Sequence, residues 1–345
     1  MPAHRERNEN RELRIEDRKC DPRFSVLSSW RLGVVFLSLV LIASITFATQ
    51  APSRTPSASA TARARATGAL KVTTGHPESV IFINSIRHGA TNEKGELDLP
   101  HVFAGVFPLR VRTVGYADWN GSVVIAAGGN RTLRVTQPPT TDEATLHYQR
   151  GESLRDKGKN KDAVEELRKA VSLRSASPDA HIAMARSLIA LQDFQEAEKQ
   201  IQAAMKFGGR SQIEAQTVLA NLRRSQGLVD ESIVEYRKAI RLARGNAFEA
   251  HIGLAIALNE LSQSHSDPRL IDEIAREYRI GITQDMETEP ILYYQLGEIL
   301  EKANRTKEAI EAYRNYLRLD PEGEYASAVE SIIKRLKEEN KETHH

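Results

Sequence analysis

Residues 293–321 read YYQLGEILEKANRTKEAIEAYRNYLRLDP, and this stretch decides the fold of the larger part of the chain. Its apolar residues recur at helical spacing, which predicts two amphipathic helices in succession. Gly297 in the first helix and Ala309 in the second are small, so the two helices can pack closely. Pro321 ends the second helix, because proline cannot continue one. The stretch therefore predicts a helical hairpin.

The same pattern recurs upstream at nearly constant spacing. One position of the second helix recurs after 34, 35, 42 and 35 residues, at Ala170, Ala204, Ala239, Gly281 and Tyr316. Two further positions keep these spacings, the first at Ala163, Ala197, Ser232, Ile274 and Ala309 and the second at Leu167, Ile201, Tyr236, Tyr278 and Tyr313. The first helix of each unit carries a small residue, at Gly151, Ala185, Ala220, Ala255 and Gly297.

This periodicity resembles the tetratricopeptide repeat (TPR), a helical hairpin that stacks into a solenoid. The resemblance covers residues 140–322 in about five units. The fourth unit departs from the pattern, because residues 262–268 add seven residues between its helices. Residues 323–345 are expected to form a capping helix and a charged tail. The resemblance implies an all-α solenoid that binds proteins.

An uncharged apolar segment lies near the N-terminus, where residues 32–48 read LGVVFLSLVLIASITFA. A helix of this length measures about 26 Å, close to the roughly 30 Å of a bilayer's hydrocarbon core. We therefore expect a transmembrane signal-anchor helix over residues 31–49, rather than a buried core helix, preceded by a cytoplasmic tail over residues 1–30. A cleaved signal peptide stays an alternative, because Thr46-Phe47-Ala48 is a weak cleavage site.

Basic residues around this segment predict its orientation in the membrane. Five precede the segment (Arg14, Arg18, Lys19, Arg23 and Arg31) and three follow it (Arg54, Arg63 and Arg65). The difference favours a cytoplasmic N-terminus and an inner-membrane location, with the bulk of the chain periplasmic or extracellular. Cys20 is the only cysteine, so the chain forms no internal disulfide.

A linker and a β domain are expected between the apolar segment and the repeats. Residues 50–67 are rich in Ala, Ser, Thr and Pro, which is typical of a flexible tether. Residues 68–138 contain short apolar runs between turn residues, which predict about six strands in a small all-β antiparallel sandwich or barrel. The runs begin at Leu70, Val80, Leu97, Val106, Ser122 and Thr132.

The sequence of the β domain resembles the PEGA domain of bacterial envelope and surface proteins. The resemblance rests on LKVTT (70–74), GATNEKGELDLP (89–100) and AGVFPLRVRTVGYADW (104–119), although the defining Pro-x-Gly-Ala is replaced by PESV at 77–80. The carboxypeptidase regulatory-like domain fits the turn from Thr91 to Gly95 almost as well. Both families are non-catalytic β modules. Tyr116 and Trp119 are expected to pack in the core or in a turn, or to form a contact patch.

The sequence contains no HExxH, GxSxG, Walker A, GxGxxG or CxxC motif, so we expect no enzyme activity, cofactor or metal site. A net charge of +2 gives no reason to expect nucleic acid as a partner, and residues 139–345 carry 30 basic against 35 acidic residues. His147, His181 and His251 share one repeat position. Equivalent positions in stacked repeats lie about 10 Å apart, too far for a common metal ion, so packing roles are expected.

The TPR resemblance implies a concave groove lined by the first helix of each hairpin. The matching positions are Tyr148, Arg155, Ile182, Arg186, Ile189, Asn221, Arg224, Ile252, Ile256, Asn259, Tyr294 and Glu298. Isoleucines flanked by arginines suggest a groove for an amphipathic or extended peptide, although the isoleucines could equally pack between helices.

Two functional hypotheses follow from this organisation. The first is a membrane-anchored, non-enzymatic scaffold at the cell envelope that binds protein partners through the groove. Its membrane contact would be the lipid bilayer around residues 31–49. The alternative is that the PEGA-like domain binds an envelope polysaccharide or peptidoglycan, a cell-wall polymer, while the repeats act as a spacer.

Overall fold

A β-rich region precedes a helical array in the computed structural model, which describes residues 66–263, 268–285 and 289–342. This order agrees with the sequence prediction of an all-β region followed by a TPR-like solenoid. The expected tail, the apolar segment and most of the linker lie outside the described residues. Within the described ranges, no helix combines the length and the apolar character needed to cross a membrane. The β region and the array belong to one compact unit, residues 62–345.

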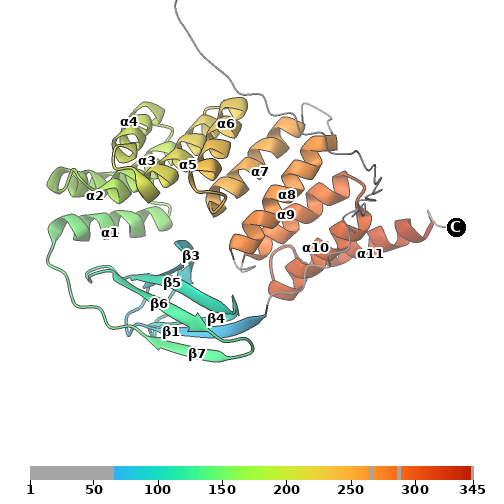
Figure 1. Ribbon diagram of the computed structural model, residues 1–345, viewed down its shortest axis with the longest axis horizontal. Helices are drawn as coiled ribbons and strands as arrows, with labels where there is room; N and C mark the ends of the chain where they lie inside the picture. Colours follow the sequence, from blue (N-terminus) through green and yellow to red (C-terminus); the bar gives the residue numbers. More distant parts are fainter. Residues whose placement is uncertain (1–65, 264–267, 286–288, 343–345) are drawn as a thin grey trace, which may run out of the picture. The chain divides into compact units, whose positions relative to one another are not determined.

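The described β region contains seven strands, β1 (Thr67–Thr73), β2 (Val80–Ile83), β3 (Ile86–Ala90), β4 (Glu96–Phe103), β5 (Gly105–Arg112), β6 (Trp119–Ile125) and β7 (Asn130–Arg134). They form a three-stranded sheet in the order β4-β1-β7 and a four-stranded sheet in the order β3-β2-β5-β6 (Figure 1). Alternate residues of the strands share one core, to which Val72 on β1, Ile81 on β2 and Val111 on β5 contribute fully buried side chains.

Two features of the β region differ from the sequence prediction. Strands β1 and β7 pair in parallel, so the sandwich is not purely antiparallel. Strand β3 was not predicted, because its sequence IRHGA lacks the alternation of apolar and polar residues that marks a half-buried strand. Its position is set by a tight turn in which Asn84 and Ser85 have φ values of 51° and 72°, as a two-residue hairpin loop requires.

The array consists of five hairpins and a final helix in the described residues. The hairpins are α1 (Glu143–Asp156) with α2 (Asn160–Leu173), α3 (Pro178–Ala190) with α4 (Phe194–Met205), α5 (Gly209–Ser225) with α6 (Val229–Leu242), α7 (Phe248–Ser262) with α8 (Pro268–Gln284), and α9 (Pro290–Lys302) with α10 (Thr306–Leu319). Helix α11 (Ala326–Glu342) follows and packs on α10. Figure 1 shows the hairpins following one another along the array.

Small residues of the repeat registers lie where the two helices of a hairpin touch. Ala163, Ala197 and Ala309 are fully buried. A Cβ atom added at Gly297 on α9 would lie 2.6 Å from the ring of Tyr313 on α10, closer than two atoms can approach. The large residue of one register therefore fills the space that the small residue of another leaves, which explains why both keep the same period.

The seven extra residues of the fourth unit are spread over the whole hairpin. Helix α7 ends at Ser262 and α8 begins at Pro268, whereas three residues separate the two helices in each of the other hairpins. Helices α7 and α8, with 15 and 17 residues, are also longer than α9 and α10, with 13 and 14. The insertion thus lengthens the two helices as well as the stretch between them and leaves the packing registers intact.

Candidate interaction groove

The predicted groove residues all lie on the first helices of the hairpins, α1, α3, α5, α7 and α9. Four of them, Tyr148, Arg155, Ile182 and Arg186, line a cleft of about 1050 Å³. Strands β2, β3 and β5 form the opposite wall of this cleft, with Phe82 among the lining residues. The other predicted positions lie outside it: Ile189, Asn221, Arg224, Ile252, Ile256, Asn259, Tyr294 and Glu298. The wall supplied by the β region was not predicted.

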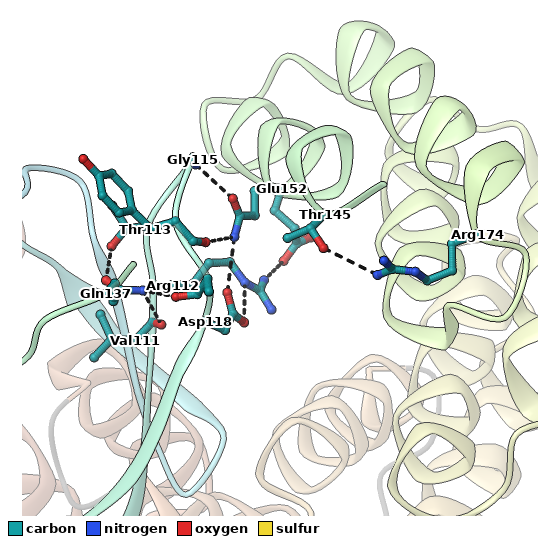
Figure 2. A network of polar contacts seen from close by, with 12 residues as sticks. Val111, Arg112, Thr113, Gly115, Asp118, Gln137, Thr145, Glu152 and Arg174 are labelled. Atoms are coloured by element: carbon teal, nitrogen blue, oxygen red, sulfur yellow. Dashed lines mark hydrogen bonds and ion pairs between the residues drawn. The ribbon is translucent and has the colours of Figure 1, made fainter. Parts of the chain in front are cut away.

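A buried glutamine on α1 holds a loop of the β region. Gln149 is 1% exposed, and its Oε1 accepts a hydrogen bond of 3.0 Å from the backbone N–H of Gly115. Its Nε2 donates to the carbonyl of Tyr116 at 2.8 Å. The loop itself is ordered by Gln137, whose side chain accepts from the Thr113 hydroxyl and donates to the carbonyl of Ala117 (Figure 2). One amide side chain thus satisfies both a donor and an acceptor of the loop.

A buried arginine on β5 makes a second connection to α1. Arg112 is 5% exposed, and its guanidinium lies 3.1 Å from Glu152 on α1 and 3.4 Å from Asp118 (Figure 2). The guanidinium also lies over the ring of Tyr148, 4.6 Å from its centroid. Burial raises the pKa of Glu152, but the charges of Arg155 and Arg112 outweigh burial, and the net pKa of Glu152 is below its ordinary value. The first hairpin and the β region are therefore held together by ionised, desolvated groups.

All three predicted groove arginines are paired within the array, and Arg155 pairs with Glu152 of its own helix. Arg186 on α3 lies 3.4 Å from Glu214 on α5 and 2.5 Å from Glu249 on α7. Arg224 on α5 lies 2.9 Å from Glu260 on α7. An acidic partner would have to compete with these carboxylates, so the arginines do not act as free anion-binding groups.

The groove isoleucines contribute to packing between helices. Ile182 is 2% exposed and belongs to the core of the second and neighbouring hairpins. Ile252 packs on Gly281 of α8, where an added Cβ atom would lie 2.3 Å from the Ile252 Cδ1. Ile189 and Ile256 are half-buried against the same cores. These contacts favour the packing alternative for the isoleucines, whereas peptide contact stays a prediction.

Tyrosines gather where the last hairpin meets the final helix. Tyr294 on α9 stacks on Tyr325, with ring centroids 4.7 Å apart and an interplanar angle of 22°. Its ring also lies 6.0 Å from Tyr313 and from Tyr316. Burial and the nearby Glu298 raise the pKa of Tyr294 above its ordinary value. The predicted groove position Tyr294 therefore also anchors the capping helix.

A hydrogen bond recurs between the two helices of four successive hairpins. It joins His147 to Glu166 (2.7 Å), His181 to Gln200 (2.6 Å), Gln216 to Glu235, and His251 to Glu277 (2.6 Å). The three histidines thus have structural partners in their own hairpins, in line with the packing role expected for them. The residues that form these hydrogen bonds from the second helices were not predicted. They nevertheless recur in the sequence at the repeat spacing, as Glu166, Gln200, Glu235 and Glu277.

Two segments of the array match family models of the tetratricopeptide repeat, residues 154–222 and residues 290–322. The helical part of this chain carries tetratricopeptide repeats. This confirms the repeat type predicted from the sequence. No curated protein matches the chain in sequence.

Solved TPR structures resemble the array at low sequence identity. PilF of Pseudomonas aeruginosa is 15% identical, with a TM-score of 0.47, over 59% of this chain and 86% of that one. The TPR protein TTC0263 of Thermus thermophilus is 16% identical, with a TM-score of 0.43, over 55% and 98%. YrrB, described as a TPR protein with an unusual peptide-binding site, is 15% identical, with a TM-score of 0.37, over 55% and 92%.

Proposed function

We propose that this protein is a membrane-anchored, non-enzymatic scaffold that binds protein partners through the first helices of its TPR array. The array alone supports a protein-interaction scaffold, because stacked repeats present one helix of every hairpin on a continuous surface. The observation that carries the proposal is that the β region covers only part of this surface. Asn259 and Tyr294 lie outside the cleft, on the helices α7 and α9.

The membrane anchor in this proposal is the uncharged segment 31–49. Its length and composition support insertion in the inner membrane with the N-terminus in the cytoplasm. The PEGA-like sequence of the β region supports a place at the cell envelope. Binding of a cell-wall polymer by the β region is less well supported, because Trp119 packs against the β core and covers Gly121 rather than standing free as a sugar platform.

Site-specific photocrosslinking tests partner binding through the groove. A photoreactive phenylalanine is placed at Asn259 in the full-length chain, expressed in its own cells. Val234 on α6 is the control position, because it is 57% exposed and belongs to a second helix, away from the predicted groove. The proposal expects a discrete crosslinked species from position 259 and none from position 234. Equal patterns from the two positions would exclude a groove-specific partner.

The lone cysteine tests the membrane topology. Intact cells whose outer barrier has been opened are treated with a membrane-impermeant maleimide, before and after lysis. Labelling of Cys20 only after lysis is expected, since the N-terminus would lie in the cytoplasm. Labelling before lysis would reverse the orientation, and a shorter product without Cys20 would mean that the segment is cleaved.

A further inference from the structure

Three successive junctions between hairpins carry exposed apolar side chains at one repeat position. Leu173 ends α2, Leu242 ends α6, and Phe207 follows α4. They are 58%, 40% and 45% exposed, respectively. The three are separated by 34 and 35 residues, so each occupies the same place in its hairpin. Because stacked second helices run in the same direction, these side chains lie along one edge of the array.

Basic residues accompany the apolar side chains along this edge. Lys206, Arg241 and Arg244 are all exposed, and none makes an ion pair within the described part of the chain. We refer to these three residues together with Leu173, Phe207 and Leu242 as the basic edge. No residue of the basic edge lines the cleft beside the β region.

The charge of the junctions changes along the array. The first three junctions, residues 172–178, 204–213 and 240–248, contain basic residues and no acidic residue. At the equivalent positions, the last two junctions, residues 283–289 and 318–324, each contain three acidic residues, and Arg318 is their one basic residue. Favourable interactions between basic residues and helix C-termini would give each junction a similar composition. They do not explain why the first three junctions lack acidic residues while the last two carry three each.

We propose that the basic edge binds the surface of an anionic lipid bilayer. Protruding leucine and phenylalanine side chains can enter the boundary between headgroups and acyl chains, while neighbouring lysine and arginine side chains contact anionic headgroups. A soluble polyanion would use the basic side chains only and would leave the three apolar side chains in water. The combination therefore fits a bilayer better than a nucleic acid or an acidic protein.

The excess of positive charge that would attract an anionic bilayer is limited to this edge. Across residues 139–345 acidic residues outnumber basic ones, 35 to 30, so a general attraction to anionic surfaces is not expected. The carboxylates nearest in sequence to the three junctions, such as Asp179 and Glu249, line the cleft on the side of the β region. The basic edge would therefore place the first three junctions of the array against the membrane.

The test uses a fluorescent label at the basic edge of the full-length chain. Cys20 is replaced by serine, and Ser172→Cys places an environment-sensitive nitrobenzoxadiazole label next to Leu173. Ser331→Cys on α11 is the control site, because Ser172 and Ser331 are both exposed helical serines that donate to a preceding carbonyl. Each protein is placed in lipid nanodiscs of phosphatidylcholine alone or with about one third phosphatidylglycerol. Co-elution with the discs reports membrane anchoring separately, and a chain that does not incorporate is added to vesicles of the same two compositions.

We expect the fluorescence emission of the label at position 172 to shift to shorter wavelength in membranes that contain phosphatidylglycerol. No such shift is expected for the label at position 331. Lys206→Glu with Arg244→Glu should abolish the shift, since each basic residue near an anionic surface contributes about a five-fold change in binding. The matched control, Lys307→Glu with Lys337→Glu, reverses two exposed lysines elsewhere and should keep the shift. The proposal is wrong if the label stays in water with both lipids or responds equally to both. Binding of heparin by the basic edge without any lipid response would assign it to a soluble polyanion instead.

Discussion

The guanidinium of Arg112 on strand β5 lies 3.1 Å from the carboxylate of Glu152 on helix α1, and both side chains are largely withdrawn from water. This pair joins the β region to the first TPR hairpin. The Glu152 carboxylate also lies 3.0 Å from the guanidinium of Arg155, on the same helix. One carboxylate therefore pairs with an arginine of the sheet and with an arginine of the predicted groove. Specific polar contacts thus help to position the β region against the array, this ion pair and the hydrogen bonds of Gln149 among them.

Replacing Arg112 by leucine should lower the free energy of unfolding by about 3 kcal/mol, because loss of one partner leaves a buried charge without full compensation. Arg87→Leu is the control on the same face of the β region. Its guanidinium is half exposed and lies 3.7 Å from Asp156, also on α1, so a loss below about 1 kcal/mol is expected. Chemical denaturation of both variants measures the difference. Similar losses would mean that burial of Arg112 adds nothing to the connection.

The repeats could be predicted from the sequence because their cause is local. Ala163 and Leu167 lie one helical turn apart, and the close contact between paired helices requires such residues in every unit. The strands could be predicted where a short apolar run lies between turn residues, as in Val80–Ile83 with the sequence VIFI, but not at β3, whose sequence IRHGA is no such run.

The wall of the cleft could not be predicted by the same means, because it depends on contacts between separate segments. One indication was nevertheless present in the sequence. Gln149 occupies the register position at which the next three units carry Ala183, Val218 and Gly253, all buried. The last unit also carries a glutamine here, Gln295, but only Gln149 is fully buried, and a fully buried amide requires a polar partner. The structure identifies that partner as the backbone of Gly115 and Tyr116.

Gly297→Ala tests whether close packing of the paired helices is the reason why small residues recur in the repeats. The added methyl group would lie 2.6 Å from the Tyr313 ring, so the variant should unfold more easily by about 1–3 kcal/mol. Without that contact, the higher helix propensity of alanine would stabilise α9 by about 1 kcal/mol. Gln295→Ala, at a half-buried position of the same helix, serves as the control and should stay within about 1 kcal/mol of the parent. A stabilised Gly297→Ala protein would refute the close-contact explanation.

His251 tests the hydrogen bond that recurs between paired helices. Its Nε2 donates to the carbonyl of Gly245 at 2.9 Å, and its Nδ1 lies 2.6 Å from Glu277. His251→Leu should cost about 2–3 kcal/mol, because the buried carboxylate loses a donor. His251→Gln should cost about 1 kcal/mol or less, since the third hairpin uses Gln216 at the same position to donate to Glu235. Thermal or denaturant unfolding separates the two, and equal losses would show that the recurring bond contributes little.

Protonation of His88 on β3 is expected to lower the stability of the folded protein in mild acid. Burial lowers the pKa of His88 to about 4, against an ordinary value of 6.5, although a backbone hydrogen bond with Ile83 acts in the opposite direction. Between these two values the unfolded chain binds a proton that the folded chain does not, so the stabilising contribution is complete above pH 6.5 and is lost as the pH falls toward 4.

His88→Gln removes this titration and is the matched variant for the pH series. Unfolding free energies of the two proteins are compared at pH 7, 6 and 5, above the range in which most carboxylates gain protons. The parent should lose up to about 1 kcal/mol more per pH unit than the variant, because one additional proton binds to its unfolded state. Parallel curves for the two proteins would mean that His88 is as accessible to protons in the folded chain as in the unfolded one.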